Sequence, residues 1–175
     1  MKAKTITASV LESLFNTLED FADLATSKKA AYRHLSIYDK NYEWTETKLG
    51  KWIASLKQEG YIRSTLEGTS DSIELTNKGK IKIVESIASK INPDKINRFV
   101  SFDIPENFRK ERDGFRRAIK KMGFVQIQKS LWVIDKDVSD LVQIAQYEYG
   151  VEKYTAYIIS SCSDIDGIIQ KKLTK

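Results

Sequence analysis

The densest group of charged side chains in the chain lies between Arg109 and Lys121, where seven residues are cationic and two are acidic. Apolar residues recur through this stretch at helical spacing, at Phe108, Phe115, Ile119 and Met122. We therefore expect a helix over 107–122 that buries one face. Its solvent face would carry a cationic stripe suited to the phosphate backbone of a duplex, made by Arg109, Arg112, Arg116 and Lys120. A solvated helix face, partly neutralised by its own acidic residues, fits the same pattern.

A second group of polar side chains lies on a predicted helix that begins after Thr45 and stops at Gly60. The apolar face of this helix consists of Leu49, Trp52, Ile53 and Leu56. The opposite face carries polar or cationic side chains that can reach base edges and phosphates: Thr47, Lys48, Lys51, Ser55 and Gln58. These five residues are candidate DNA contacts.

The surroundings of this helix predict a DNA-binding module. Two further helices are expected before it, over 9–25 and 27–38, and two alternating segments around a polar turn after it predict a β-hairpin. Three helices and a hairpin form a winged helix-turn-helix, in which the third helix enters the major groove and the hairpin contacts the backbone. Arg63, on the first strand, is the candidate contact of the wing. Winged helices also serve as protein-interaction modules, so that alternative stays open.

The rest of the chain predicts a second domain. One further helix is expected after the hairpin, with Ile81, Val84, Ile87 and Ile91 on its inner face, and Pro93 interrupts it. From Asn97 the pattern predicts strand, helix, two short strands, helix and strand, an order typical of a ferredoxin-like unit. The tail after residue 160 fits a short helix or a frayed extension. We therefore predict an α+β protein, with a winged helix-turn-helix domain over 1–92 and a ferredoxin-like dimerisation domain over 97–175.

The composition narrows the classes of function. In 175 residues, 29 Lys and Arg stand against 24 Asp and Glu, and the net charge of +5 favours polyanionic partners. The single cysteine, Cys162, cannot form an intrachain disulfide, and with the single histidine, His34, it cannot assemble a Cys/His zinc site. No secretory leader and no bilayer-spanning apolar run is recognisable, so we expect a cytoplasmic protein with no membrane partner.

The segment 99–133, FVSFDIPENFRKERDGFRRAIKKMGFVQIQKSLWV, resembles the central domain of the PaaX family of transcriptional repressors. That domain in turn resembles the small CRISPR-associated subunit of spacer acquisition, a dimeric ferredoxin-like protein. The N-terminal half is similar to the winged-helix domain of PaaX proteins through TKLGKWIASLKQEGYI and SIELTNKGK. The likeness covers about Val10 to Tyr157, and it implies a homodimer whose partner is double-stranded DNA.

The same resemblance draws attention to Asp103, at the end of the first predicted strand. In the spacer-acquisition family an aspartate at this place is the proposed metal ligand, and it faces its twin across the dimer axis. Two carboxylates brought together repel each other, and Mg²⁺ between them would relieve the repulsion. Asp103 is therefore the candidate catalytic residue and metal ligand, and Mg²⁺ the possible cofactor. A carboxylate before a helix also stabilises the helix N-terminus without catalysis, and PaaX-type repressors imply no hydrolysis.

These observations predict a dimeric, sequence-specific DNA-binding transcriptional regulator that represses by occupying a promoter. One alternative is a metal-dependent CRISPR-associated endonuclease or integration-complex subunit, with the winged helix as a DNA-targeting arm. Another is an interaction module that does not bind nucleic acid. The sequence identifies neither the operator nor a small-molecule effector.

Overall fold

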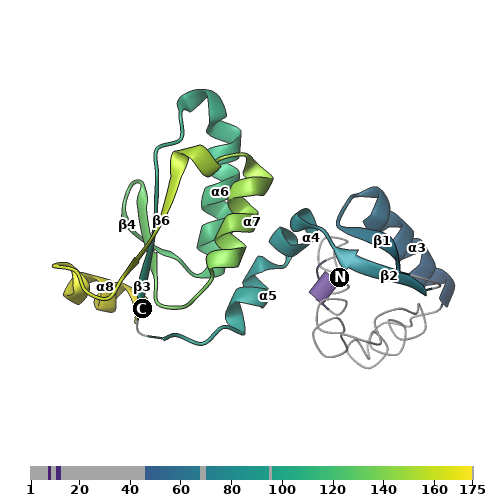
Figure 1. Ribbon diagram of the computed structural model, residues 1–175, viewed down its shortest axis with the longest axis horizontal. Coiled ribbons are helices and arrows are strands. Elements are labelled where there is room, and N and C mark those ends of the chain that lie inside the picture. The colour runs from purple at the N-terminus through teal and green to yellow at the C-terminus, as the bar shows by residue number, and fades with distance from the viewer. Residues whose placement is uncertain (1–7, 9–10, 13–45, 68–69, 95, 175) are drawn as a thin grey trace. The chain divides into compact units, whose positions relative to one another are not determined.

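The computed structural model describes residues 8, 11–12, 46–67, 70–94 and 96–174 of the chain. The chain divides into two compact units, Met1–Ile83 and Val84–Lys175, and combines helices with strands (Figure 1). The predicted α+β class is therefore confirmed. The two helices predicted before residue 45 lie outside the described residues, apart from residues 8 and 11–12, which are helical.

The first unit contains α3 (Glu46–Gln58) and a hairpin of two antiparallel strands, β1 (Ile62–Glu67) and β2 (Ser70–Leu75). Ile53 and Leu56 form the buried side of α3. The helix ends where Gly60 takes a left-handed φ of 74°, which costs glycine little. The third helix and the hairpin predicted from the sequence are present, and the assignment of the whole unit as a winged helix stays a prediction.

A hydrogen-bonded junction connects the hairpin to the short helix α4 (Asn77–Lys82). The Thr76 hydroxyl caps this helix by accepting a hydrogen bond from the Gly79 N–H at 3.1 Å. The same hydroxyl donates to the Gly60 carbonyl at 2.7 Å. Gly79 is buried against the Tyr61 carbonyl, and a Cβ at residue 79 would overlap that oxygen. The threonine and the glycine of SIELTNKGK therefore have a structural role.

The long helix expected around 81–91 is interrupted. Ile83, with φ −113° and ψ 19°, separates α4 from α5 (Val84–Ser89), and its N–H bonds the Lys80 carbonyl, three residues back. Crowding among the β-branched residues at 81, 83 and 84 disfavours a regular helix turn here. Because α5 packs against a helix of the second unit, the compact units divide at this break rather than near Pro93.

The second unit is built on a four-stranded antiparallel sheet. Its main elements are β3 (Asn97–Phe102), α6 (Arg109–Met122), β4 (Val125–Gln128), β5 (Leu131–Ile134), α7 (Ser139–Tyr149) and β6 (Thr155–Ser160). The strand order is β4-β5-β3-β6, with β6 at one edge. This is the predicted ferredoxin-like arrangement. Two short 3₁₀ turns, η1 (Glu106–Phe108) and η2 (Glu152–Tyr154), precede α6 and β6.

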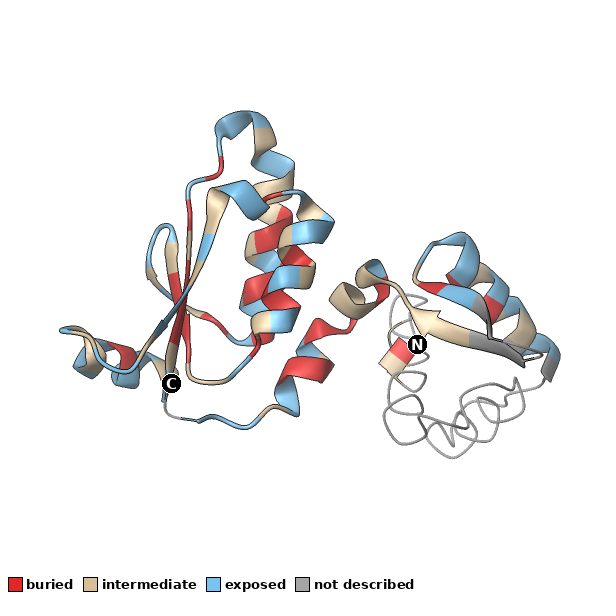
Figure 2. Ribbon diagram, viewed as in Figure 1, coloured by how far each residue is buried: buried red, intermediate tan, exposed pale blue. Residues whose placement is uncertain are grey.

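Helices α6 and α7 cover one face of this sheet (Figure 1). Buried residues line both helices and β3 in Figure 2, and the Phe102 ring of β3 meets the Phe115 ring of α6 edge-on at 5.7 Å. The two helices approach closely at Gly114, where a Cβ would lie 2.7 Å from Cδ1 of Tyr149. The apolar face predicted for α6 is therefore the face that packs in the core.

The last helix, α8 (Asp166–Leu173), packs on β4, and its residue Ile169 joins Phe99 and Val133 in a buried cluster. The Asp166 carboxylate accepts hydrogen bonds from the Ser163 N–H and hydroxyl, at 3.1 and 2.9 Å. It also accepts one from the Asn97 side chain at 3.0 Å. These bonds, the Ser163 N–H first, hold the pKa of Asp166 below its usual value. The tail is therefore a short helix whose first residue is tied to the preceding turn and to β3.

An ion pair between the buried Arg98 and the exposed Asp94 fixes the segment that leads into β3. Arg98 donates to both carboxylate oxygens of Asp94, at 2.7 and 2.6 Å, and the Asp137 carboxylate lies 3.7 Å from the same guanidinium. Hydrogen bonding to Arg98 lowers the pKa of Asp94 from 3.8 to about 2. Because the Asp94 N–H also donates to the Asp135 carbonyl at 2.9 Å, this segment is anchored to the sheet domain.

Candidate nucleic-acid interface

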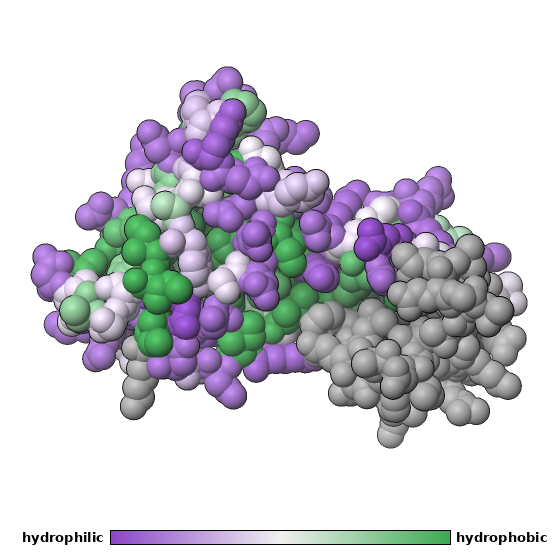
Figure 3. Space-filling view, in the orientation of Figure 1, coloured by the Kyte–Doolittle hydropathy of each residue, from purple (hydrophilic) through white to green (hydrophobic). Residues whose placement is uncertain are grey.

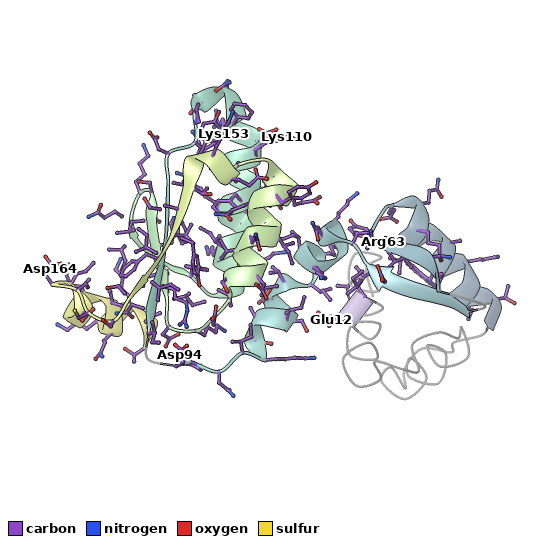
Figure 4. The ribbon with its side chains drawn as sticks, viewed as in Figure 1. Glu12, Arg63, Asp94, Lys110, Lys153 and Asp164 are labelled. Carbon is purple, nitrogen blue, oxygen red and sulfur yellow. The ribbon has the colours of Figure 1, made fainter. Side chains whose placement is uncertain are left out.

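The outer face of α6 is strongly cationic. Among the four stripe residues predicted on it, Arg109 and Lys120 are exposed, and three neighbouring cations are exposed beside them, Lys110, Arg117 and Lys121. The Arg109 guanidinium lies 3.9 Å from Glu106, a loose surface pair. Figure 4 places Lys110 and Lys153 at one end of the unit and Asp94 at the other. This exposed set can meet a polyanion without moving the core.

Arg112 has a different environment. Its side chain is 18% exposed and donates to the Glu106 carboxylate at 2.8 Å. A longer bond of 3.4 Å reaches the Ile104 carbonyl. The Arg112 bond lowers the pKa of Glu106 and raises that of Arg112 itself. Arg112 therefore fastens the loop after β3 to α6, and a DNA contact would have to compete with these bonds.

Arg116 is also engaged inside the domain. Its side chain is 30% exposed, and the guanidinium carbon lies 5.3 Å from the centroid of the Phe102 ring. Asp113, one turn earlier, is 4.0 Å away. The structure thus separates the four predicted stripe residues into two that face solvent and two that pack against the core and the loop.

The polar face of α3 brings three of its predicted contacts together. Lys48, Lys51 and Ser55 line a surface depression of about 240 Å³, and Trp52 lines it with them. Thr47 and Gln58 are exposed outside this lining. Trp52 was predicted as a core residue with Ile53, but it is only half-buried, because its position lies between the buried and exposed faces of the helix.

Arg63 on the hairpin is exposed but paired. Its guanidinium meets the carboxylate of Glu74, directly opposite on β2, at 2.8 and 2.9 Å. Cross-strand charge pairs of this kind stabilise a hairpin modestly. A phosphate contact by Arg63 would therefore replace the pair with Glu74.

Asp103 lies in the exposed loop after β3, and its N–H donates to the Tyr154 carbonyl at 2.9 Å. Throughout the part of the chain that the structure describes, no three His, Cys, Asp or Glu side chains gather where they could hold a metal ion. A single carboxylate within one chain would hold Mg²⁺ only together with waters, phosphate oxygens or a second chain. The loop is held instead by Arg112, and no helix starts directly at Asp103.

The edge strand β6 presents apolar side chains to solvent. Ile158 is 46% exposed and Ile159 is 62% exposed, and Figure 3 shows apolar surface along this strand. The strand sequence TAYIIS contains no charge and no proline, the two common protections of a free sheet edge. In the described segments, no helix is both long enough and apolar enough to cross a bilayer.

The comparisons with known proteins agree with this architecture. Residues 92–171 match a family model described as the PaaX protein central Cas2-like domain. The match covers the whole ferredoxin-like sheet, both of its helices and most of α8. No curated protein and no solved structure matches the chain. The likeness to the PaaX family that the sequence predicted is thus supported over residues 92–171, the part of the chain that is similar to the PaaX central Cas2-like domain.

Proposed function

We propose that this protein is a sequence-specific DNA-binding transcriptional regulator of the PaaX type, and that it represses by occupying promoter DNA. The observation that carries the proposal is the pairing of a PaaX-type central domain with a preceding unit in which a helix with a cationic face leads into a β-hairpin. Such a helix and hairpin are the DNA-contacting parts of a winged helix. The exposed cations of α6 would add contacts to the phosphate backbone.

The regulator is proposed to act as a homodimer through the second unit. An uncharged edge strand with two exposed isoleucines supports this, because antiparallel pairing of two β6 edges would satisfy their free backbone groups and place a neighbouring strand beside both isoleucines. The two-fold symmetry of such a dimer would relate its two copies of α3. The operator should be an inverted repeat, with half-sites separated by about 10 base pairs or a multiple of it.

The direct test is selection of bound sequences from a random duplex pool by the full chain, with the mass of the complex measured in solution. We expect a symmetric consensus bound by two chains. Binding should weaken as salt rises, since phosphate contacts compete with counterions. Enrichment of no sequence at low salt would contradict the proposal and favour a module that binds protein.

A double variant, Arg117→Glu with Lys120→Glu, tests whether α6 contributes to DNA binding. Both substitutions change exposed cations only. If both contact phosphates, the slope of log affinity against log salt should fall by about 2. Lys129→Glu with Lys171→Glu is the matched control, because it makes the same change of charge on exposed residues outside α6. If the salt slope falls equally in both variants, the loss reflects the overall charge of the protein and not a contact made by α6.

The nuclease alternative rests on the exposed carboxylate of Asp103 in a Cas2-like domain. Mg²⁺-dependent cleavage that disappears in Asp103→Asn would establish it. We expect the regulator instead, with unchanged duplex affinity in this variant and no cleavage of bound DNA by either protein.

A further inference from the structure

The depression on α3 combines two chemistries on one helix face. Lys48, Lys51, Trp52 and Ser55 stand three or four residues apart, or adjacent, so their side chains share one side of the helix. The lysines carry positive charge on long apolar stems, and the indole adds a flat apolar surface with one N–H donor. Ser55 is held in place by its hydrogen bond to Glu59 at 3.1 Å.

In the part of the chain that the structure describes, Trp52 stands apart from the buried side of α3. Ile53 and Leu56 fill the buried side of α3, at 3% and 0% exposure, whereas Trp52 is half-buried and borders the depression. An aromatic ring that lines a depression together with two lysines is suited to a partner that is anionic at one point and apolar beside it. The sugar-phosphate backbone of DNA has this alternation, since each phosphate adjoins a deoxyribose whose carbon atoms are apolar.

We infer that this depression receives one sugar–phosphate unit of duplex DNA, with the deoxyribose against the Trp52 indole and the phosphate at Lys48 and Lys51. The inference rests on the proposed function and deepens it, because it assigns this side of α3 to backbone positioning. Base reading is then left to the exposed residues outside the lining, Thr47 and Gln58. Phosphate contacts fix the register of a protein on DNA without reading sequence.

Tryptophan fluorescence of the full chain tests the contact directly. Trp44→Phe with Trp132→Phe leaves Trp52 as the single tryptophan. Acrylamide quenching is measured without ligand, with a mixed-sequence duplex and with inorganic polyphosphate, while the anisotropy of labelled duplex reports binding. We expect the duplex to lower the quenching constant at least about twofold and polyphosphate to leave it unchanged. If the double variant does not fold, the difference between the unsubstituted chain and Trp52→Phe gives the same information.

Each outcome decides between distinct conclusions. Bound duplex with unchanged Trp52 quenching would overturn the inference and leave the proposed function standing. Equal protection by polyphosphate would overturn the deoxyribose contact, because the phosphates alone would then cover the ring. An absence of duplex binding by anisotropy would overturn the proposed function itself, and the inference with it.

The duplex affinities of substituted proteins test the same contact independently. Trp52→Ala should lower affinity for target and random duplexes alike, by about tenfold, with an unchanged salt slope. Lys51→Ala should also weaken both duplexes but reduce the salt slope by about 1. Lys57→Ala, an exposed lysine of the same helix outside the depression, is the control and should change neither. Loss of discrimination in Trp52→Ala would show that the ring reads a base.

Discussion

Substitution of Gly79 by alanine should loosen the junction that places the hairpin beside α3. A Cβ at residue 79 would overlap the Tyr61 carbonyl oxygen and lie 3.2 Å from the Leu75 side chain. The carbonyl is backbone and already accepts the Thr76 N–H at 3.0 Å, so no rotamer change relieves the overlap. The hairpin and α4 must separate instead.

The expected change in the free energy of unfolding combines one stabilising contribution and two destabilising ones. Alanine is favoured over glycine inside a helix by up to about 1 kcal/mol. Overpacking a tight contact costs about 1–3 kcal/mol, and weakening the Thr76 bond to Tyr61 adds about 1 kcal/mol. We therefore expect a net loss of about 2 kcal/mol for Gly79→Ala. Among the described residues, no atom lies within 4 Å of a hypothetical Cβ at Gly50 in α3, so Gly50→Ala should gain about 1 kcal/mol.

Urea unfolding of the full chain measures both variants. In a Trp44→Phe, Trp132→Phe background, Trp52 fluorescence reports the first unit, while far-UV circular dichroism reports both units. Both probes are needed because two units can unfold in separate steps. The free energies of unfolding of the two alanine variants should differ from each other by about 3 kcal/mol, with Gly79→Ala below the unsubstituted chain and Gly50→Ala above it. A Gly79→Ala protein as stable as Gly50→Ala would refute the close contact between α4 and the hairpin.

Two further predictions concern the second unit. Burial, and after it the nearby Asp137 carboxylate, raises the pKa of Tyr157 from 10.0 to about 12. As the pH rises, the Tyr157 hydroxyl therefore loses its proton in the unfolded chain before it does so in the folded protein. The resulting stability is complete below pH 10 and lost as the pH rises toward 12. Alkaline unfolding curves of Tyr157→Phe should lack this loss, and curves identical to those of the unsubstituted chain would contradict it. Asp166→Ala should fray α8 by removing its bonds to Ser163, and hydrogen exchange over residues 166–173 should accelerate while β3 stays protected.

The periodicity of apolar residues was sufficient to predict most of the second unit. The expected helix over 107–122 corresponds to η1 and α6, because Phe115, Ile119 and Met122 fall on one side of a 3.6-residue helix and all three are buried. Gly150 ends α7 in the left-handed conformation expected of a C-terminal glycine. Such local rules succeed where packing and propensity agree.

Two features show what local rules leave open. A regular helix through Ile83 satisfies the apolar spacing, but the helix breaks there, and α5 beyond the break packs against α6, a contact that spacing does not encode. For α8, the pattern around its start is a local one, a hydrogen bond between the Ser163 and Asp166 side chains. The packing of this helix on β4 is a tertiary contact, and nothing in the pattern specifies it.

The cations of α6 are the clearest case in which identity and spacing do not determine a role. Arg112 and Arg116 lie on the same helix as Lys120, yet they bind Glu106 and cover the Phe102 ring. Removing either would disturb the loop that follows β3, and the resulting loss of DNA affinity would resemble the loss of a phosphate contact. Substitutions at Arg117 and Lys120 avoid this ambiguity, because both side chains are exposed. A fall in salt slope at these two positions, and not merely a fall in affinity, is therefore the evidence that would place a duplex on α6.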